Sequence, residues 1–203
     1  MARDKSPIVK QSRREGDALA PKAQKVMVKK SGIPGEHSGM RARGGSLYLT
    51  QLREKQKVRR LYGLLERQFA KLMDEAMKAD GLSGENLLQY LERRADNAVY
   101  RAGFATTRRA ARQLVSHGHF LLNGKRINIP SLRLKPGDVL TVRPGSANTT
   151  YFKNLENINA STQPLSWMKA DVKKMKIEIT GLPKREEAEV GINEQLIVEY
   201  YSR

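Results

Sequence analysis

The sequence predicts an α+β protein in which amphipathic helices precede a small antiparallel sheet. Apolar residues recur at spacings of three and four between residues 51 and 116, the period of a helix that packs one face against a core. Between residues 119 and 143, apolar and polar residues alternate between turn sequences, which is typical of short strands. Residues 1–46 mix Lys and Arg with Gly, Pro and Ser, and we expect a flexible basic N-terminal arm there.

Composition favours a polyanionic partner. The chain has 203 residues, 39% of them hydrophobic, with 38 Lys and Arg against 21 Asp and Glu, a formal net charge of +17 and a pI of about 10.2. A membrane surface is the weaker expectation, because the sequence has neither a run of about 18 apolar residues nor a basic helix with a Trp- or Phe-rich face. The absence of cysteine excludes disulfides and thiolate metal sites, and no signal-peptide stretch opens the chain, so a reducing cytosolic setting fits.

The excess positive charge is concentrated in two parts of the chain. Residues 1–50 carry 11 basic and 4 acidic groups, a net charge of +7, and residues 91–150 carry 11 and 3, a net charge of +8. Residues 51–90 have a net charge of +2, and residues 151–203 have 8 groups of each sign. We therefore expect two basic surfaces and a neutral C-terminal segment with another role.

A first long helix is expected from Gln51 to Ala79. Its apolar positions share one face, and they are Val58, Leu61, Tyr62, Leu65, Phe69, Leu72, Met73 and Ala76. A second stripe is cationic and consists of Arg53, Lys57, Arg60, Arg67 and Lys71. Such a stripe can follow phosphates, but it can equally be a solvated face that the nearby Glu54, Glu66, Asp74 and Glu75 partly neutralise, and both interpretations stay open.

Two shorter helices are expected next. Gly81 ends the first helix, and Ser83 can cap a second that reaches about Arg101. After the break at Gly103, Thr106 or Thr107 can cap a third helix that continues through Ser116.

The third helix carries the strongest candidate anion site. Arg108, Arg109 and Arg112 lie within one turn of each other near its positive N-terminus, and the neighbouring sequence contains no acid. Planar guanidinium groups can clasp phosphate oxygens and stack on bases. We therefore expect these three side chains to contact a nucleic acid.

Strands follow the helices. Residues 119–122 and 125–129 flank an Asn123-Gly124 turn and predict a hairpin, and residues 132–135 and 139–143 predict further extended chain around Pro136-Gly137-Asp138. Residues 144–150 are small and mostly polar, which is typical of a linker and predicts a module boundary near residue 150. The last fifty residues contain a short alternating stretch from Met175 to Ile179 and a closing helix from about Asn193, which should pack on the helix of residues 51–79.

Several motifs resemble one protein family, the small ribosomal subunit protein four family. In the central module they are Leu91 to Arg101 (LERRADNAVYR), Gly103-Phe104-Ala105, Ala111 to Val115, His117-Gly118-His119, Asn123-Gly124 and Ile129-Pro130-Ser131. In the flanks they are Pro34 to His37, Arg53 to Lys57, Tyr62-Gly63 and Glu194 to Arg203. The resemblance covers most of the chain.

The resemblance implies a fold and a set of partners. It implies a module inserted into a helical domain, with three parts: a basic arm at residues 1–46, a helical RNA-binding domain at 47–91 and 151–203, and an RNA-binding module at 92–150. It implies a structural constituent of the small ribosomal subunit, either cytoplasmic or organellar, that binds 16S ribosomal RNA early in assembly at a multi-helix junction of the 5′ domain. Implied neighbours are messenger RNA at the entry channel, with an effect on translational accuracy, and the fifth small-subunit protein. We expect no catalytic activity, no cofactor, no membrane and no homo-oligomer, and a zinc-free arm, since the cysteine cluster of many members is absent.

Candidate RNA-binding residues come from the cationic segments and the matched motifs. They are Arg3, Lys10, Arg13, Arg14, Arg41, Arg43, Tyr48, Arg53, Lys57, Arg60, Arg67, Lys71, Arg108, Arg109, Arg112, Gln113, Ser116, His117, Lys125 and Arg126. In this interpretation, lysines and arginines displace counterions from the RNA while rigid elements select its shape.

Competing interpretations are weaker. An enzyme is one, since similar modules accompany pseudouridine synthases and Arg94-Ala95-Asp96 faintly resembles a catalytic motif, but we expect Asp96 to form a helix-surface ion pair. A metal site at His117 and His119 lacks acidic or thiolate partners nearby. A stand-alone factor that rescues stalled ribosomal complexes would need only the central module and would leave the flanking motifs unexplained.

Overall fold

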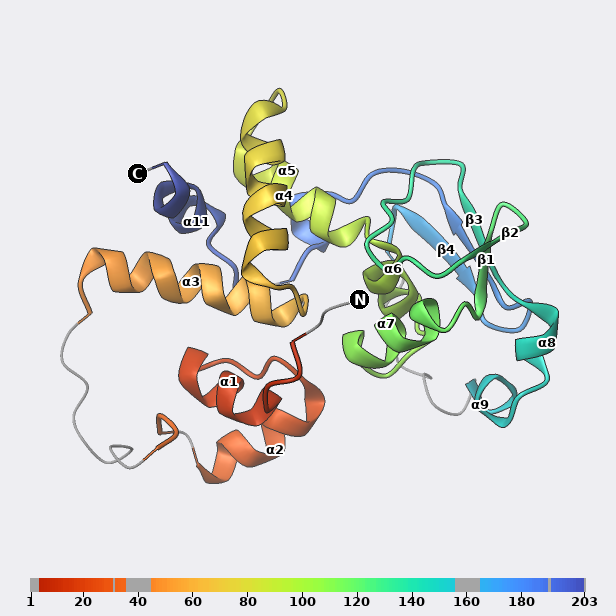
Figure 1. Cartoon of the computed structure of the whole chain (residues 1–203), viewed down its shortest axis with the longest axis horizontal. Coiled ribbons are helices and arrows are strands. Elements are labelled where there is room, and N and C mark those ends of the chain that lie inside the picture. The colour runs from red at the N-terminus through yellow and green to blue at the C-terminus, as the bar shows by residue number, and fades with distance from the viewer. Residues whose placement is uncertain (1–3, 31, 36–44, 156–164, 190, 203) are drawn as a thin grey trace. The chain divides into compact units, whose positions relative to one another are not determined.

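A computed structural model describes residues 4–30, 32–35, 45–155, 165–189 and 191–202 (Figure 1). The chain divides into two compact units, the first made of Met1–Leu87 with Val190–Arg203 and the second of Leu88–Glu189. Each unit has helices, and the second also contains an antiparallel sheet. The predicted α+β class is confirmed.

The first unit is helical in its described part. Its helices are α1 (Ile8–Glu15), α2 (Pro21–Lys29), α3 (Leu47–Leu61), α4 (Glu66–Lys78) and α11 (Glu194–Tyr201), and α5 (Ser83–Glu92) begins there. The Ser46 and Asn193 side chains cap α3 and α11, each accepting a hydrogen bond from a backbone N–H of the first turn. The predicted start of the closing helix at Asn193 is confirmed.

Residues 8–29 are more regular than the loosely structured chain expected for the range 1–46, because they form two helices that pack together. The Ser12 hydroxyl accepts a hydrogen bond from the Leu19 amide (3.2 Å) and donates one to the Ile8 carbonyl (2.9 Å), which joins α1 to the following loop. Leu19 and Ala23 are buried beside it. A few small contacts of this kind are not visible as periodicity, so composition alone indicated an irregular arm.

The predicted helix over 51–79 is two helices. It breaks at Tyr62 and Gly63, where Gly63 adopts a left-handed φ of 66°, and α4 begins three residues later. Leu64 is fully buried within this turn. The helical spacing of apolar residues continues across the break because both helices face the same core, so the pattern could not reveal it.

Helix α11 packs along α3, as predicted for the closing helix. Lys55 is 3% exposed, with its Nζ 2.6 Å from Glu66 Oε1 and 4.5 Å from the centre of the Tyr200 ring. The Tyr201 hydroxyl donates to the same Glu66 oxygen (2.9 Å), and Gln51 Nε2 donates to Glu199 (2.8 Å). The last helix therefore completes the core of the first unit.

The second unit places two short helices beside a sheet. The helices are α6 (Ala95–Arg101) and α7 (Arg108–Ser116), and the sheet order is β2-β1-β3-β5-β4. Its antiparallel strands are β1 (Phe120–Leu122), β2 (Lys125–Ile127), β3 (Val139–Val142), β4 (Met168–Asp171) and β5 (Lys176–Ile179), with the short helical segments α8 (Pro144–Ala147), α9 (Thr150–Lys153) and η2 (Arg185–Glu187) between or after them.

The β1–β2 hairpin forms as predicted. Asn123 and Gly124 have φ values of 48° and 81°, the two positive values that a type I′ turn requires. The register pairs Leu122 with Lys125 and Phe120 with Ile127. Phe120 points into the core, where its ring meets that of Phe104 edge to face at 6.1 Å.

The helix expected from Ser83 to Arg101 is interrupted at Arg93 and Arg94. The Ala95 amide donates to the Leu132 carbonyl and the Leu134 amide donates to the Arg93 carbonyl, each at 2.8 Å. This segment therefore exchanges backbone hydrogen bonds with residues 132–134, where the predicted strand is reduced to an isolated bridge between Arg94 and Arg133.

The second unit extends beyond the boundary expected at residue 150. Strand β5 pairs with β3, with Leu140 opposite Ile177, and β4 pairs with β5. Trp167 is 1% exposed in the same core. Residues 165–189 therefore belong to the sheet unit, and only α11 returns to the helical unit. Strand pairing between positions almost forty residues apart leaves no local signal in the sequence.

Candidate nucleic-acid interface

In the first unit, the cationic stripe of α3 is paired with acids that come from outside α3. Arg53 and Arg60 pair with Glu15 at the end of α1, and Lys57 Nζ lies 2.7 Å from Asp17. These acids come from the end of α1 and the segment that follows it, so they are far from α3 in the sequence. The α3 cations hold α1 in place, and their charge is partly neutralised.

Other cations of this unit remain accessible. Arg67 and Lys71 on α4 are exposed, as are Lys10 and Arg14 on α1. The Arg13 guanidinium is partly buried and donates from Nε to the Gly32 carbonyl (2.9 Å). The cationic surface of the unit therefore comes from α1 and α4 more than from α3.

Tyr48 lies in the described part of the chain, whereas three candidate arginines of the N-terminal arm do not. Tyr48 is 48% exposed at the start of α3, and its ring lies 5.7 Å from that of Tyr200. Arg3, Arg41 and Arg43 lie outside the described residues.

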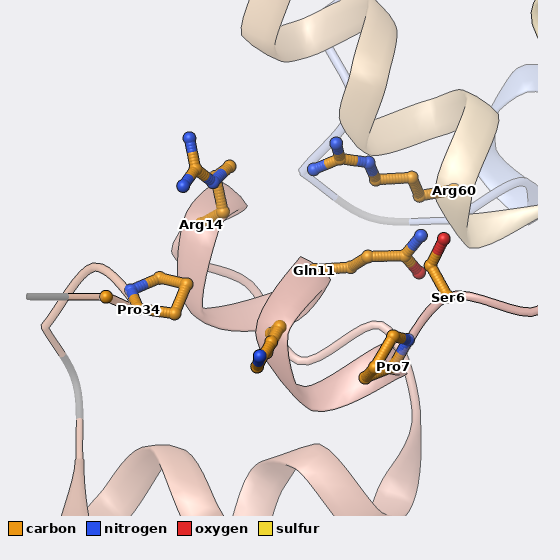
Figure 2. A pocket seen from close by; sticks show the side chains of 8 residues that line it. Ser6, Pro7, Gln11, Arg14, Pro34 and Arg60 are labelled. Atoms are coloured by element: carbon orange, nitrogen blue, oxygen red, sulfur yellow. The ribbon is translucent and has the colours of Figure 1, made fainter.

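A pocket opens between α1 and α3 of the first unit. Its volume is about 350 Å³. It is lined by Ser6, Pro7, Lys10, Gln11, Arg14, Pro34, Gly35 and Arg60 (Figure 2). Three of these side chains are cationic, so an anion would be favoured there.

In the second unit, α7 presents a polar face. The Thr107 hydroxyl caps the helix by accepting from the Ala110 amide (3.2 Å), so Thr107 is the cap of the two that the sequence allowed. Ala111 and Val115 are buried, which turns the exposed Arg109, Gln113 and Ser116 outward at spacings of four and three.

The hairpin extends this surface. Arg126 Nη2 donates to the His117 carbonyl (3.4 Å) just after α7 ends, and both side chains are exposed. The Arg126 guanidinium lies over Gly118, where an added Cβ would be 2.5 Å from Nε. We call the resulting surface the α7–hairpin face, and its residues are Arg109, Gln113, Ser116, His117, Lys125 and Arg126.

Arg112 is not on that face. It is 7% exposed, and its Nη1 lies 3.1 Å from Asp96 Oδ2. Arg94 binds both oxygens of the same carboxylate at 3.0 and 2.8 Å. The ion pair predicted for Asp96 exists, but it is buried rather than on the helix surface, since Asp96 is 5% exposed. The expectation that Arg112 has no acidic partner was wrong.

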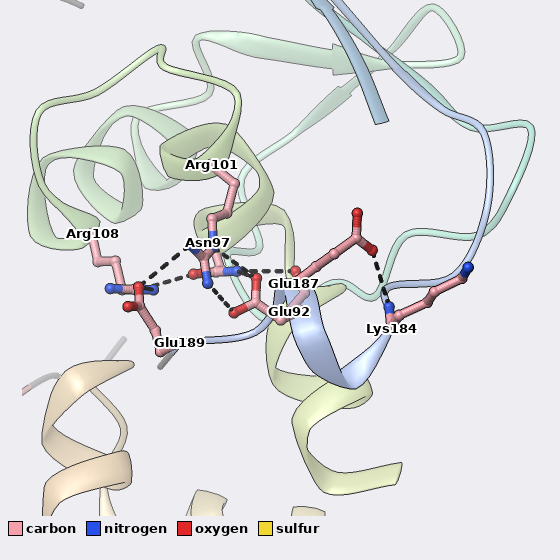
Figure 3. A network of polar contacts seen from close by, with 7 residues as sticks. All are labelled: Glu92, Asn97, Arg101, Arg108, Lys184, Glu187 and Glu189. Carbon is pink, nitrogen blue, oxygen red and sulfur yellow. Dashed lines mark hydrogen bonds and ion pairs between the residues drawn. The ribbon is translucent and has the colours of Figure 1, made fainter. Parts of the chain in front are cut away.

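Arg108 also has an acid beside it. Its Nη2 lies 2.6 Å from Glu189 Oε1, and its Nε donates to Asn97 Oδ1 (2.8 Å) (Figure 3). Its guanidinium also stacks on the Tyr100 ring, 4.5 Å from the ring centre. Burial disfavours the Glu189 charge, but Arg108 and Arg101 outweigh it and lower the pKa of this carboxyl. Glu189 is 81 residues from Arg108, so the sequence offered no signal for the pair.

The same network continues to Glu92, which is 1% exposed. Arg101 donates to both Glu92 oxygens at 3.0 and 2.8 Å, and Asn97 Nδ2 donates to Oε2 at 2.7 Å (Figure 3). These contacts tie α5, α6 and α7 together. Charged groups that resembled binding residues in the sequence are therefore the framework that positions α7.

The two histidines have separate surroundings. His119 Nδ1 lies 2.9 Å from the Ser146 hydroxyl, and its ring contacts Phe152. Burial, with the charges of His117, Arg143 and Arg126, lowers the pKa of His119. Among the described residues, no three His, Asp or Glu side chains gather as metal ligands do, and no helix is long and apolar enough to span a membrane.

The second unit presents a cationic helix beside a hairpin, and the first unit is basic and helical. These features define a nucleic-acid-binding protein, without a recognisable catalytic centre in its described part. Residues 3–92 match the family described as ribosomal protein S4/S9 N-terminal domain, and residues 93–140 match the S4 domain. Relatives called small ribosomal subunit protein uS4 are 50% identical in Chloroflexus aurantiacus, 48% in a Roseiflexus species and 46% in Clostridioides difficile, each alignment covering 100% of both chains. The chain belongs to the uS4 family of ribosomal proteins, which confirms the resemblance.

Proposed function

We propose that this protein binds 16S ribosomal RNA directly, at a multi-helix junction of the 5′ domain, early in assembly of the small subunit. Family membership makes it a structural and non-enzymatic constituent of the small ribosomal subunit. The observation that supports direct binding is the α7–hairpin face, where cations and polar groups from two elements share one exposed surface.

The physical basis of recognition is shape. Arg109, Lys125 and Arg126 displace counterions from phosphates, while Gln113, Ser116 and His117 offer polar contacts. The partly buried ion pair of Arg108 and the buried ion pair of Arg112 hold α7 in place, so the positions of the surface cations are set before RNA arrives. A rigid arrangement of cations fits one junction better than an arbitrary duplex, since folded RNA is recognised mainly by contour.

Further partners also belong to this proposal. On the family resemblance, the protein lies beside the fifth small-subunit protein and at the messenger RNA entrance, where it affects translational accuracy. The accessible cations of the first unit, among them Arg67 and Lys71, supply charge for a second RNA contact.

A binding experiment tests the central claim. The full chain is titrated with a transcript of the 16S 5′ domain and with an unrelated duplex of equal length at physiological salt. We expect about tenfold or greater preference for the transcript. Equal affinity would contradict recognition of the junction.

Fractionation separates a subunit constituent from a transient factor. Small subunits are washed at high salt and sedimented, and the protein is followed by immunoblot. A constituent stays with the particles, whereas release into the supernatant would indicate the stand-alone factor considered above.

A further inference from the structure

The pocket of the first unit contains polar groups that the rest of the fold does not satisfy. Gln11 is 7% exposed, and its Oε1 is buried without a hydrogen-bond partner among the described residues. Arg60 Nε is buried and likewise unpartnered in the described part of the chain. Both residues line the pocket (Figure 2). Native proteins leave few buried polar atoms unsatisfied, so such atoms in a pocket indicate a ligand.

The orientation of the Gln11 amide is fixed. Its Nε2 donates to Asp4 Oδ2 at 2.7 Å, so the nitrogen is committed and the oxygen is the atom left to accept. Burial opposes the Asp4 charge, but hydrogen bonds from Ser6 and Gln11 lower the pKa of this carboxyl, which stays an acceptor at neutral pH. The pocket therefore offers one acceptor that requires a donor from the ligand.

Arg60 supplies the complementary group. Its Nη1 is committed to Glu15, which leaves Nε as a charged donor. Lys10 and Arg14 also line the pocket, and both side chains are exposed. The pocket thus combines a cationic rim with a buried donor and a buried acceptor.

We propose that this pocket binds one ribose-phosphate unit of RNA and distinguishes RNA from DNA. The ribose 2′-hydroxyl both donates and accepts, so it satisfies Gln11 Oε1 and Arg60 Nε together, and the adjacent 3′-phosphate meets Lys10 and Arg14. Inorganic phosphate lacks the sugar, so it cannot place a hydroxyl between Gln11 and Arg60 while its charge meets Lys10 and Arg14, and a deoxyribose has no hydroxyl at that position. The inference rests on the proposed RNA-binding function and adds which chemical group is read.

The size and lining of the pocket agree with this ligand. A volume of about 350 Å³ lies near the lower end of the range for ligand pockets, about 300 to 1,000 Å³. It therefore suits a single nucleotide unit. The Pro7 and Pro34 rings provide apolar surface against which the sugar carbons can pack.

The test uses small probes and the full chain. Isotope-labelled protein is titrated with adenosine 3′-monophosphate, 2′-deoxyadenosine 3′-monophosphate and inorganic phosphate, while the Gln11 side-chain amide and the Arg60 Nε–H are followed by NMR. We expect saturable shifts of both signals with the ribonucleotide, and about tenfold weaker binding of the deoxyribonucleotide and of phosphate. Equal affinity for the two nucleotides, or shifts of neither signal, would overturn the proposal.

Variants locate the effect. Lys10→Ala with Arg14→Ala should weaken both nucleotides equally, because these cations meet the phosphate, whereas Gln11→Met should remove the preference for the ribonucleotide. Lys22→Ala on α2, an exposed lysine outside the pocket, is the matched control and should change neither. Full-length transcript binding is measured alongside. If the transcript binds normally while the nucleotides are not distinguished, the pocket proposal fails and the RNA-binding function stands.

Discussion

Asp96 resembles a catalytic residue in the sequence, but in the fold it holds neighbouring arginines in place. Its Oδ1 accepts from Arg94 Nε and from the Asn97 amide, each at 3.0 Å, and its Oδ2 accepts from Arg94 Nη2 and Arg112 Nη1. A buried carboxylate is tolerated only when its oxygens are satisfied in this way. The charge of Arg112 is therefore compensated inside the protein, and its neighbour Arg109 is the exposed arginine.

Replacing Arg112 by Ala should destabilise the protein. The change removes one charge-assisted hydrogen bond from a buried carboxylate, while both bonds from Arg94 remain, so we expect a loss of about 2 to 3 kcal/mol in the free energy of unfolding. Urea denaturation measures it. Arg109→Ala, on the same helix but exposed, should change stability by less than about 0.5 kcal/mol. Equal effects of the two substitutions would contradict the buried ion pair.

Glu189 should contribute to stability in a pH-dependent way. Its folded-state pKa lies below the ordinary 4.5, so its contribution is present above that pH and is lost as pH falls through the folded-state pKa. Glu189→Gln should therefore lower stability at pH 7 and make the decline from neutral to acidic pH shallower, which denaturation at several pH values measures. Glu186→Gln, an exposed neighbour, is the control. A decline as steep as in the unsubstituted protein would show that Glu189 adds nothing.

At the scale of elements, local signals were reliable where one residue type decides the geometry. The Asn123-Gly124 turn and a threonine cap at the start of α7 each depend on the backbone preference or reach of a single side chain, and both are confirmed, with Thr107 as the cap. The start of the closing helix near Asn193 is also confirmed. The breaks at Gly63 and Arg94 were missed, because apolar spacing continues across both. The spacing of apolar residues shows which face of a helix is buried, but it does not show where one helix ends and the next begins in a new direction.

Gly118 connects α7 to the hairpin, and its substitution should separate stability from binding. Gly118 (φ +71°) and Gly124 (φ +81°) both have left-handed backbones, so Ala at either should cost roughly 1 to 2 kcal/mol. At Gly118 the new methyl group would also displace the Arg126 guanidinium, whereas nothing lies within 4 Å at Gly124. Only Gly118→Ala should lower transcript affinity several-fold. Equal affinities of the two variants, measured by gel shift, would argue against a role for Arg126.

At the scale of the whole molecule, charge predicted the kind of partner and not the side chains that face it. The net charge of +17 correctly indicated a nucleic-acid-binding class. Which cations are accessible depends on acids brought close by folding, such as Glu15 for Arg60 and Glu189 for Arg108. Pairs of this kind span 45 and 81 residues, so no local pattern could identify them.

The α7–hairpin face should account for a defined share of the salt dependence. Replacing Arg109 and Arg126 by Ala should reduce the magnitude of the slope of log K against log salt by about 2, because each arginine neutralises about one phosphate. Affinity measured from low to physiological salt provides the slope. Lys169→Ala with Lys173→Ala makes the same charge change on β4 and its turn, at the sheet edge opposite β2, and should leave the slope unchanged. Similar reductions for both pairs would mean that only total charge matters.

The order of elements along the chain constrains the order in which the parts of this protein can fold during synthesis. Helix α3 packs against α11, which follows the whole second unit in the sequence, and β3 lacks one neighbour until β5 has been made. The helical unit can therefore complete its core only after the second unit has been synthesised. Until then, α3 lacks the partner that covers its side facing α11.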